Sequence, residues 1–161
     1  MVLNLTVTAV NDAPVLKPAG TTVTILEDAG TPSGAVGTLV SSLVATSQSD
    51  VDGGAVKGIA ITTLSSASGT WYYTIDGGTN WTQVSTAPSA GSALLLASDA
   101  NTRVYFKPNA NFNGTVTSPL TFRAWDQTSG GNGGRFDTTS NGGTSAFSSA
   151  TFLATAMGIM D

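Results

Sequence analysis

Residues 69–81 read GTWYYTIDGGTNW, a pattern that predicts two β-strands joined by a tight turn. In an extended strand, Trp71, Tyr73 and Ile75 lie on one face because successive side chains point to opposite sides. The Asp-Gly-Gly sequence at residues 76–78 suits a turn, since glycine adopts positive φ angles without a steric penalty. Antiparallel strand pairs are therefore expected to build this protein.

Similar β-like runs occur along the whole chain. Each run is short, rich in β-branched or aromatic residues, and bounded by Gly, Asn, Asp, Ser or Pro. Because no helical segment separates them, the sequence predicts an all-β protein with antiparallel pairing, either a sandwich or a barrel. The runs are residues 6–10, 22–26, 37–44, 56–63, 71–75, 81–84, 92–97, 102–107, 120–125 and 148–154.

Most of the large aromatic side chains are expected in the core, because a small domain needs its large residues inside. Phe106 alternates with Val104 on one run, and Phe122 with Ala124 on another. Four aromatic residues adjoin predicted turns, so that core packing and carbohydrate stacking both remain open for them. These are Trp81, Phe112, Trp125 and Phe147.

Small side chains dominate the composition. Ala, Gly, Ser and Thr fill about half of the 161 positions, and charged residues make up only 10%. A chain of this length supports one domain with its own core. The chain has nine Asp residues and one Glu, and Asp is the carboxylate of turns and of loops that bind hard cations.

Two residue types are missing, since the sequence contains no His and no Cys. Thiolate nucleophiles, Ser-His-Asp triads, disulfides and zinc sites built on thiolate or imidazole are therefore excluded. The formal net charge of -4 and the scattered Lys and Arg residues argue against nucleic acid as a partner. No apolar run is long enough for membrane insertion. We expect a protein that is not an enzyme.

A Gly-rich stretch, residues 130–143, separates two of the predicted strands. It predicts a long polar hairpin loop, longer than most such connections. Arg135 and Asp137 are its only charged residues, and they are opposite in sign. The loop is interpreted as an ornament rather than as a functional arm.

Val10-Asn11-Asp12-Ala13-Pro14 resembles the linker between tandem cadherin-like, immunoglobulin-like repeats of giant bacterial surface proteins, including the extender regions of RTX adhesins. Further matches to such repeats follow in order, and together they cover about residues 6 to 155. They are Leu26–Asp28, Ser49–Gly54, Gly69–Trp81, Asp99–Val104, Phe112–Gly114, Leu120–Asp126 and Ala146–Ser148.

The resemblance implies an immunoglobulin-like, cadherin-like β-sandwich stiffened by Ca²⁺. Such a repeat acts as a spacer that projects a terminal ligand-binding region from the bacterial cell surface. It would be extracellular, with adjacent repeats of the same polypeptide as its partners. The resemblance also implies a set of metal ligands: Asn11, Asp12, Glu27, Asp28, Asp50, Asp52 and Asp126.

The chemistry of this ligand set is that of calcium, which takes six to eight oxygen ligands from flexible loops. Asp50 and Asp52 lie on the same side of an extended segment, and Gly53-Gly54 permits a sharp turn after them. Such a pair offers half of a calcium site. An ordinary Asp-Gly hairpin corner explains the same pair equally well.

The resemblance also divides the chain. Residues 1–14 would be the closing strand and linker of an upstream repeat, residues 15–156 the sandwich, and residues 157–161 an added tail. The domain's closing strand would then be cut short after Ala156. Because Leu3, Leu5, Val7 and Ala9 form one apolar face, residues 3–10 are expected to pair with the incomplete edge of a neighbouring molecule.

Three alternatives to a spacer remain. A glycan- or protein-binding module would use exposed aromatic residues and the Gly-rich loop. A glycosidase-like enzyme would use Asp50 and Asp126 as acid and base. An autocatalytic Lys–Asn crosslink would start from Lys57 or Lys107. Residues 74–81 also resemble the Asp-box of sialidases, which implies a tight structural hairpin and no activity.

Overall fold

The computed structural model describes residues 1–17, 22–117, 119–154 and 156–160. Within them the chain forms fourteen strands and one helical turn, so the predicted all-β class is confirmed. The elements are β1 (Val15–Leu16), β2 (Thr22–Leu26), β3 (Thr38–Leu39), α1 (Val40–Val44), β4 (Gln48–Ser49), β5 (Gly58–Leu64), β6 (Gly69–Thr74), β7 (Thr82–Gln83), β8 (Ala93–Ala97), β9 (Arg103–Pro108), β10 (Gly114–Thr117), β11 (Leu120–Trp125), β12 (Arg135–Phe136), β13 (Phe152–Leu153) and β14 (Ala156–Met160).

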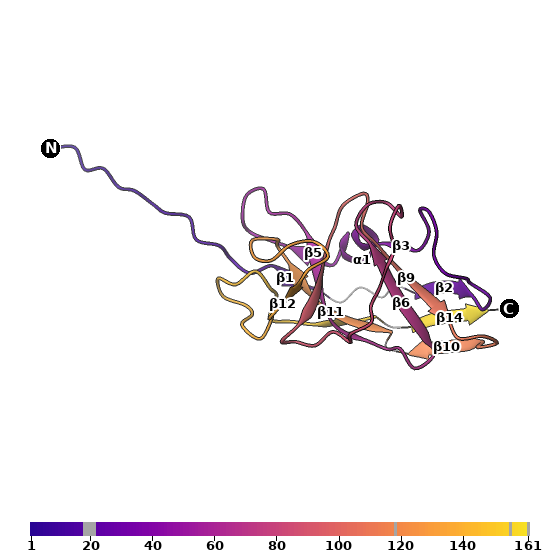
Figure 1. The fold of residues 1–161 in the computed structure, drawn as a ribbon. Helices are drawn as coiled ribbons and strands as arrows, with labels where there is room; N and C mark the ends of the chain where they lie inside the picture. The colour runs from indigo at the N-terminus through magenta and orange to yellow at the C-terminus, as the bar shows by residue number, and fades with distance from the viewer. Residues whose placement is uncertain (18–21, 118, 155, 161) are drawn as a thin grey trace.

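Two antiparallel sheets form the layers of a sandwich (Figure 1). One sheet has five strands in the order β12-β8-β5-β11-β13, and the other has four in the order β3-β9-β6-β7. A three-stranded sheet, β10-β14-β2, and the short pair β1-β4 complete the fold.

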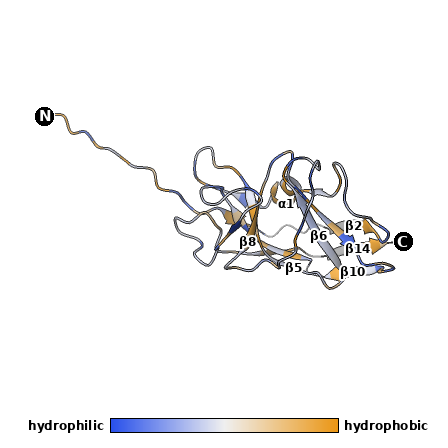
Figure 2. Ribbon diagram, in the orientation of Figure 1, coloured by the Kyte–Doolittle hydropathy of each residue, from blue (hydrophilic) through white to orange (hydrophobic). Residues whose placement is uncertain are grey.

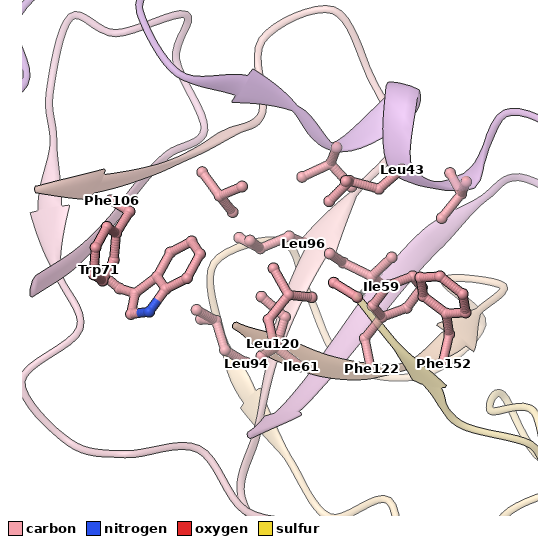
Figure 3. Packing of buried hydrophobic residues seen from close by; sticks show 14 of the residues in the cluster. Leu43, Ile59, Ile61, Trp71, Leu94, Leu96, Phe106, Leu120, Phe122 and Phe152 are labelled. Atoms are coloured by element: carbon pink, nitrogen blue, oxygen red, sulfur yellow. The ribbon is translucent and has the colours of Figure 1, made fainter. Parts of the chain in front are cut away.

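The main core lies between the layers (Figure 3). Trp71 of β6 and Phe106 of β9 pack with ring centroids 5.0 Å apart, as their alternation predicts. Phe122 of β11 meets Phe152 of β13 edge to face at 5.3 Å. Ile59 and Leu96 fill the space between these aromatic pairs, so side chains from both layers share one apolar interior.

A second apolar cluster lies on the other face of the five-stranded sheet. Strand β8 is buried on both faces, because Leu94 and Leu96 join the main core while Leu95 joins the second cluster. Trp125 and Phe147 are the large members of that cluster, each at most 2% exposed. The second cluster exists because residues 127–147 fold back over the sheet.

The Gly-rich stretch is therefore part of the fold, and its interpretation as an ornament is wrong. It contributes β12, which pairs with β8 at the sheet edge. Arg135 anchors it by donating hydrogen bonds of 3.0 Å to the Ser92 carbonyl and 2.6 Å to the Thr86 carbonyl. Tyr73 donates a further hydrogen bond to the Gly133 carbonyl at 3.2 Å.

One predicted strand is partly helical. Residues 37–44 form the short strand β3 followed by α1. Val40, Leu43 and Val44 are all buried, and their i, i+3, i+4 spacing places them on one helical face. The prediction of a strand was wrong here because helical spacing buries these three side chains together.

The hairpin at residues 74–81 has the expected form. Asp76 accepts hydrogen bonds from the backbone and side chain of Asn80, at 2.9 and 2.7 Å, and from the Thr74 hydroxyl at 2.8 Å. Gly78 has φ of +96°, and a Cβ there would collide with the Gly34 carbonyl. Trp81 donates to the same carbonyl at 3.1 Å, so the hairpin also holds the loop after β2.

The last strand of the chain does not end at Ala156 but begins there. Strand β14 continues to Met160, runs antiparallel to β10 and pairs in parallel with β2. The prediction that the closing strand is cut short is therefore wrong, and residues 157–160 belong to the folded region. The parallel pair also departs from the uniform antiparallel pairing expected.

The N-terminal segment, residues 1–10, extends away from the domain (Figure 1). The strand predicted at residues 6–10 has no partner strand in the single molecule described. Val2, Leu3, Leu5 and Val7 are each more than 80% exposed, and apolar and polar residues alternate along the segment (Figure 2). The two ends of the chain lie at opposite ends of the molecule (Figure 1).

Candidate functional site

Five of the seven predicted metal ligands lie together where the N-terminal segment enters the domain. A chain of hydrogen bonds connects them, from Asp126 through the linker residues to Asp52 and Asp50. We call these five residues the linker clasp: Asn11, Asp12, Asp50, Asp52 and Asp126.

Asn11 makes the contacts that fix the linker. Its Nδ2 donates to Asp126 Oδ2 at 2.9 Å and to the carbonyls of Ser145 and Thr144 at 3.2 and 3.4 Å. The next backbone bond in the linker joins the amide of Ala13 to the Gly143 carbonyl at 2.8 Å. Residues 11–13 are thereby attached to the loop that follows β12.

Asp126 is the buried member of the clasp, only 3% exposed at the end of β11. Its Oδ1 accepts two hydrogen bonds from Thr128, 2.9 Å from the amide and 2.6 Å from the hydroxyl. Its Oδ2 takes the Asn11 bond. A buried carboxylate requires such partners, because an unpaired charge away from water is costly. Both oxygens of the Asp126 carboxylate are therefore engaged in hydrogen bonds, and one of these bonds holds the linker.

Asp50 and Asp52 form the other half of the clasp. Asp52 Oδ2 accepts a 2.8 Å hydrogen bond from the Asp12 amide, and Asp50 Oδ1 accepts one of 3.0 Å from the Asp52 amide. The Ala55 amide bonds the Asp52 carbonyl at 3.2 Å, and Gly54 has φ of +80°. The segment is thus a tight corner, as one of the two interpretations predicted, and the Asp52 carboxylate also reaches the linker.

One oxygen of the clasp has no protein partner. Asp50 Oδ2 is inaccessible to solvent and accepts no hydrogen bond from the described residues. The residue also lines a groove of about 420 Å³, together with the linker, residues 49–51 and loop residues up to 150. Asp12 and Asp50 both contribute to its wall. A buried acceptor without a partner costs free energy.

The clasp has not gathered three carboxylates around one point, and no such group of acidic residues exists in the described part of the chain. Its carboxylates at present accept hydrogen bonds from the linker and the corner. A cation bound here would need Asp12, Asp50 and Asp52 to turn their oxygens toward the groove.

Glu27 and Asp28 are not part of the clasp. They follow β2, where the Glu27 amide donates to the Met160 carbonyl at 2.8 Å. This is the end of the molecule at which the chain leaves the domain (Figure 1). The structure therefore divides the seven predicted ligands into a set of five at one end and a pair at the other.

The loop that begins with this pair is held against the outer face of β9. Alternate residues of β9 donate to it: Arg103 to the Gly37 carbonyl at 3.4 Å, Tyr105 to the Gly30 carbonyl at 2.9 Å, and Lys107 to the Thr31 hydroxyl at 3.3 Å. Burial of the Tyr105 hydroxyl and the nearby Tyr72 raise the pKa of Tyr105. Tyr105 thus serves as a neutral hydrogen-bond donor.

The aromatic residues left open in the sequence take structural positions. Trp125 and Phe147 are buried in the second cluster, and Phe112 packs on the main core. Trp81 bonds the loop after β2 and lies edge-on to Tyr105 at 5.8 Å. A glycan-stacking role for Trp125 or Phe147 is therefore excluded.

Sequence reasoning missed the contribution of the Gly-rich stretch and of the residues flanking it to the clasp. The carbonyls of Gly143, Thr144 and Ser145 bind the linker, and Thr128 binds Asp126. Every residue type carries a backbone carbonyl, so these acceptors cannot be recognised from the pattern of side chains in the sequence. The one available signal was the unusual length of the connection.

No protein-family model matches the chain, and searches of curated proteins and of solved structures found no similar protein. Among the described residues, the single helix is far too short to span a membrane. What the clasp does must therefore follow from its own geometry.

Proposed function

We propose that this domain is a calcium-stabilised structural spacer, one repeat of a bacterial cell-surface adhesin. It is extracellular, and its partners are adjacent repeats of the same polypeptide. It projects a terminal ligand-binding region away from the cell and carries out no catalysis itself.

The observation that carries the proposal is the linker clasp. A spacer must fix the direction of the segment that joins it to its neighbour, because a free linker gives a flexible string. The joint is held by hydrogen bonds between the linker and the rest of the domain. They involve the side chains of residues 11, 52 and 126 and the carbonyls of residues 143–145. The opposite positions of the two chain ends suit a repeat arranged head to tail (Figure 1).

The unpartnered Asp50 oxygen supports calcium at this joint. Asp12 and Asp50 line one groove, and Asp52 is hydrogen-bonded to both of these residues. Their mutual repulsion is relieved when a divalent cation joins them, and oxygen-only loops suit Ca²⁺. Calcium would then stiffen the joint beyond what the hydrogen bonds achieve.

Glu27 and Asp28 provide the corresponding acidic groups at the other end. In a tandem array, the linker that follows this repeat would meet them there. The five clasp residues would face the upstream repeat in the same way. Each junction would then draw ligands from two repeats.

A chain of two copies joined in tandem tests the spacer role. Small-angle X-ray scattering should give a longer maximum dimension and a narrower distance distribution with calcium than with EDTA. Asn11→Ala combined with Asp52→Ala, in the second copy only, should abolish the difference. A joint that is equally flexible with and without calcium would contradict the proposal, provided that both copies are folded by circular dichroism.

A further inference from the structure

Strands β2 and β14 form a five-residue parallel pair close to the two ends of the folded chain. Its register runs from Thr22 opposite Ala156 to Leu26 opposite Met160. Strand β14 is central in its sheet, because four of its residues also pair with β10 on the other side. The last strand is therefore hydrogen-bonded along both edges.

We propose that this parallel pair is a mechanical clamp that resists stretching of the domain along its long axis. The inference rests on the proposed spacer role, because tension between chain ends is the load that a tethered repeat carries. It adds to that role a specific element that bears the load.

The direction of loading follows from the topology. Tension from the N-terminal side enters β2 at Thr22, and tension from the C-terminal side enters β14 at Met160. These residues lie at opposite ends of the parallel pair. The two strands are thus pulled past each other along their length, perpendicular to the hydrogen bonds between them. Such shear loads all the hydrogen bonds of the pair together.

An antiparallel pair formed by the first and last strands would be loaded differently. Both pulling points would then lie at the same end of the pair, and its hydrogen bonds would break one after another. In the parallel pair the two pulling points lie at opposite ends, so the hydrogen bonds between the strands are sheared together and not broken one by one. Strand β14 cannot slide without also breaking its pairing with β10.

The linker clasp lies in series with this clamp. Force from the N-terminus meets Asn11 and Ala13, then the pair β1-β4, and then the bond from the Lys17 amide to the Ser47 carbonyl at 2.7 Å. These contacts are few, so the clasp orients the joint, whereas the longer pair β2-β14 limits the unfolding force.

Single-molecule pulling from two sets of points tests the clamp. The chain contains no cysteine, so introduced thiols are unique attachment sites. In the shear geometry the handles attach at Val2→Cys and at a cysteine added after residue 161. In the unzipping geometry they attach at Gly30→Cys and at the same added cysteine. A Cβ at Gly30 meets no atom within 4 Å, so that this substitution fits without strain.

In the unzipping geometry, both handles pull from the Leu26–Met160 end of the same pair. We expect the shear geometry to need a severalfold higher unfolding force, because forced unfolding follows the barrier along the pulled direction. Equal forces in the two geometries, or a lower force in shear, would overturn the clamp.

Repeating both measurements in EDTA separates the two proposals. The clamp predicts that the difference between geometries persists without calcium, since β2 and β14 pair through their backbones. A persistent difference together with no calcium effect on melting would leave the clamp standing and remove the calcium-stabilised spacer. If the two pulling geometries gave equal unfolding forces both with calcium and in EDTA, the clamp would be contradicted and the spacer proposal would be unaffected.

Discussion

Asn11 Nδ2 lies 2.9 Å from Asp126 Oδ2, although 115 positions of the chain separate the two residues. This bond joins the incoming linker to the end of β11, an interior strand of the five-stranded sheet. The direction of the upstream segment is consequently set by a rigid part of the domain.

Asn11→Ala should lower the free energy of unfolding by about 1–3 kcal/mol, because it leaves the buried Asp126 Oδ2 without its partner. Urea denaturation measures the loss. Asn4→Ala serves as the control, since Asn4 lies in the exposed N-terminal segment and should change nothing. Two variants of equal stability would show that the Asn11 bond does not hold the linker.

Asp52→Ala should weaken calcium binding far more than Asp137→Ala, although each removes one carboxylate. Asp52 contacts the linker within the clasp. Asp137 is exposed and accepts bonds from the Thr139 side chain and amide, which lower its pKa. Isothermal titration calorimetry gives both affinities. If the two agree within error, the ligand assignment is wrong.

Arg135→Ala should expose the second apolar cluster. Loss of its two hydrogen bonds to the segment before β8 frees β12, at a cost of about 1–2 kcal/mol. Hydrogen exchange should rise in residues 127–147 while β6 and β9 remain protected. Lys17→Ala, at an exposed position, is the matched control. Unchanged exchange in the Gly-rich stretch would mean that Arg135 does not anchor it.

Asp76→Asn should destabilise the domain in a manner that depends on pH. Hydrogen bonds from the Asn80 amide, the Asn80 side chain and Thr74 lower the pKa of Asp76 from 3.8 to about 2. A lowered folded-state pKa contributes stability above pH 3.8, and that contribution disappears as the pH falls toward 2. Solvent screening keeps it small, since Asp76 is exposed.

Thermal melting of both proteins between neutral pH and about pH 2 tests this linkage. The gap in melting temperature between wild type and Asp76→Asn should be constant near neutrality and should narrow below pH 3.8. A gap that stays the same throughout would show that the Asp76 charge contributes nothing to the hairpin.

Much of the fold could be predicted from sequence because its signals are local. The alternation of Trp71 and Tyr73 and the turn residues at 76–78 fix a hairpin without reference to the rest of the chain. Strand β2 was predicted with its observed bounds for the same reason. Short strands such as β1 and β4 escaped, because two residues carry no periodicity and their pairing depends on tertiary contact.

The candidate site was less accessible to such reasoning. Asn11, Asp12, Asp50, Asp52 and Asp126 were chosen by resemblance, and only the fold shows that hydrogen bonds connect them. Glu27 and Asp28 lie elsewhere because β2 carries them to the far end of the domain. Strand β14 was missed because Gly158 and the residues Met157 and Met160 weaken its β-like pattern, whereas pairing along both edges stabilises it.

Thermal melting of the isolated domain in EDTA and in calcium tests the central claim most directly. For sites that bind near 0.1 mM, the affinity class of extracellular calcium modules, about 1–10 mM free calcium adds ~1.4–2.7 kcal/mol per occupied site. The account predicts a melting temperature that rises with calcium in wild type and responds much less in Asp52→Ala. A melting temperature that is identical in EDTA and in 10 mM calcium (about 100 times that dissociation constant) would contradict it.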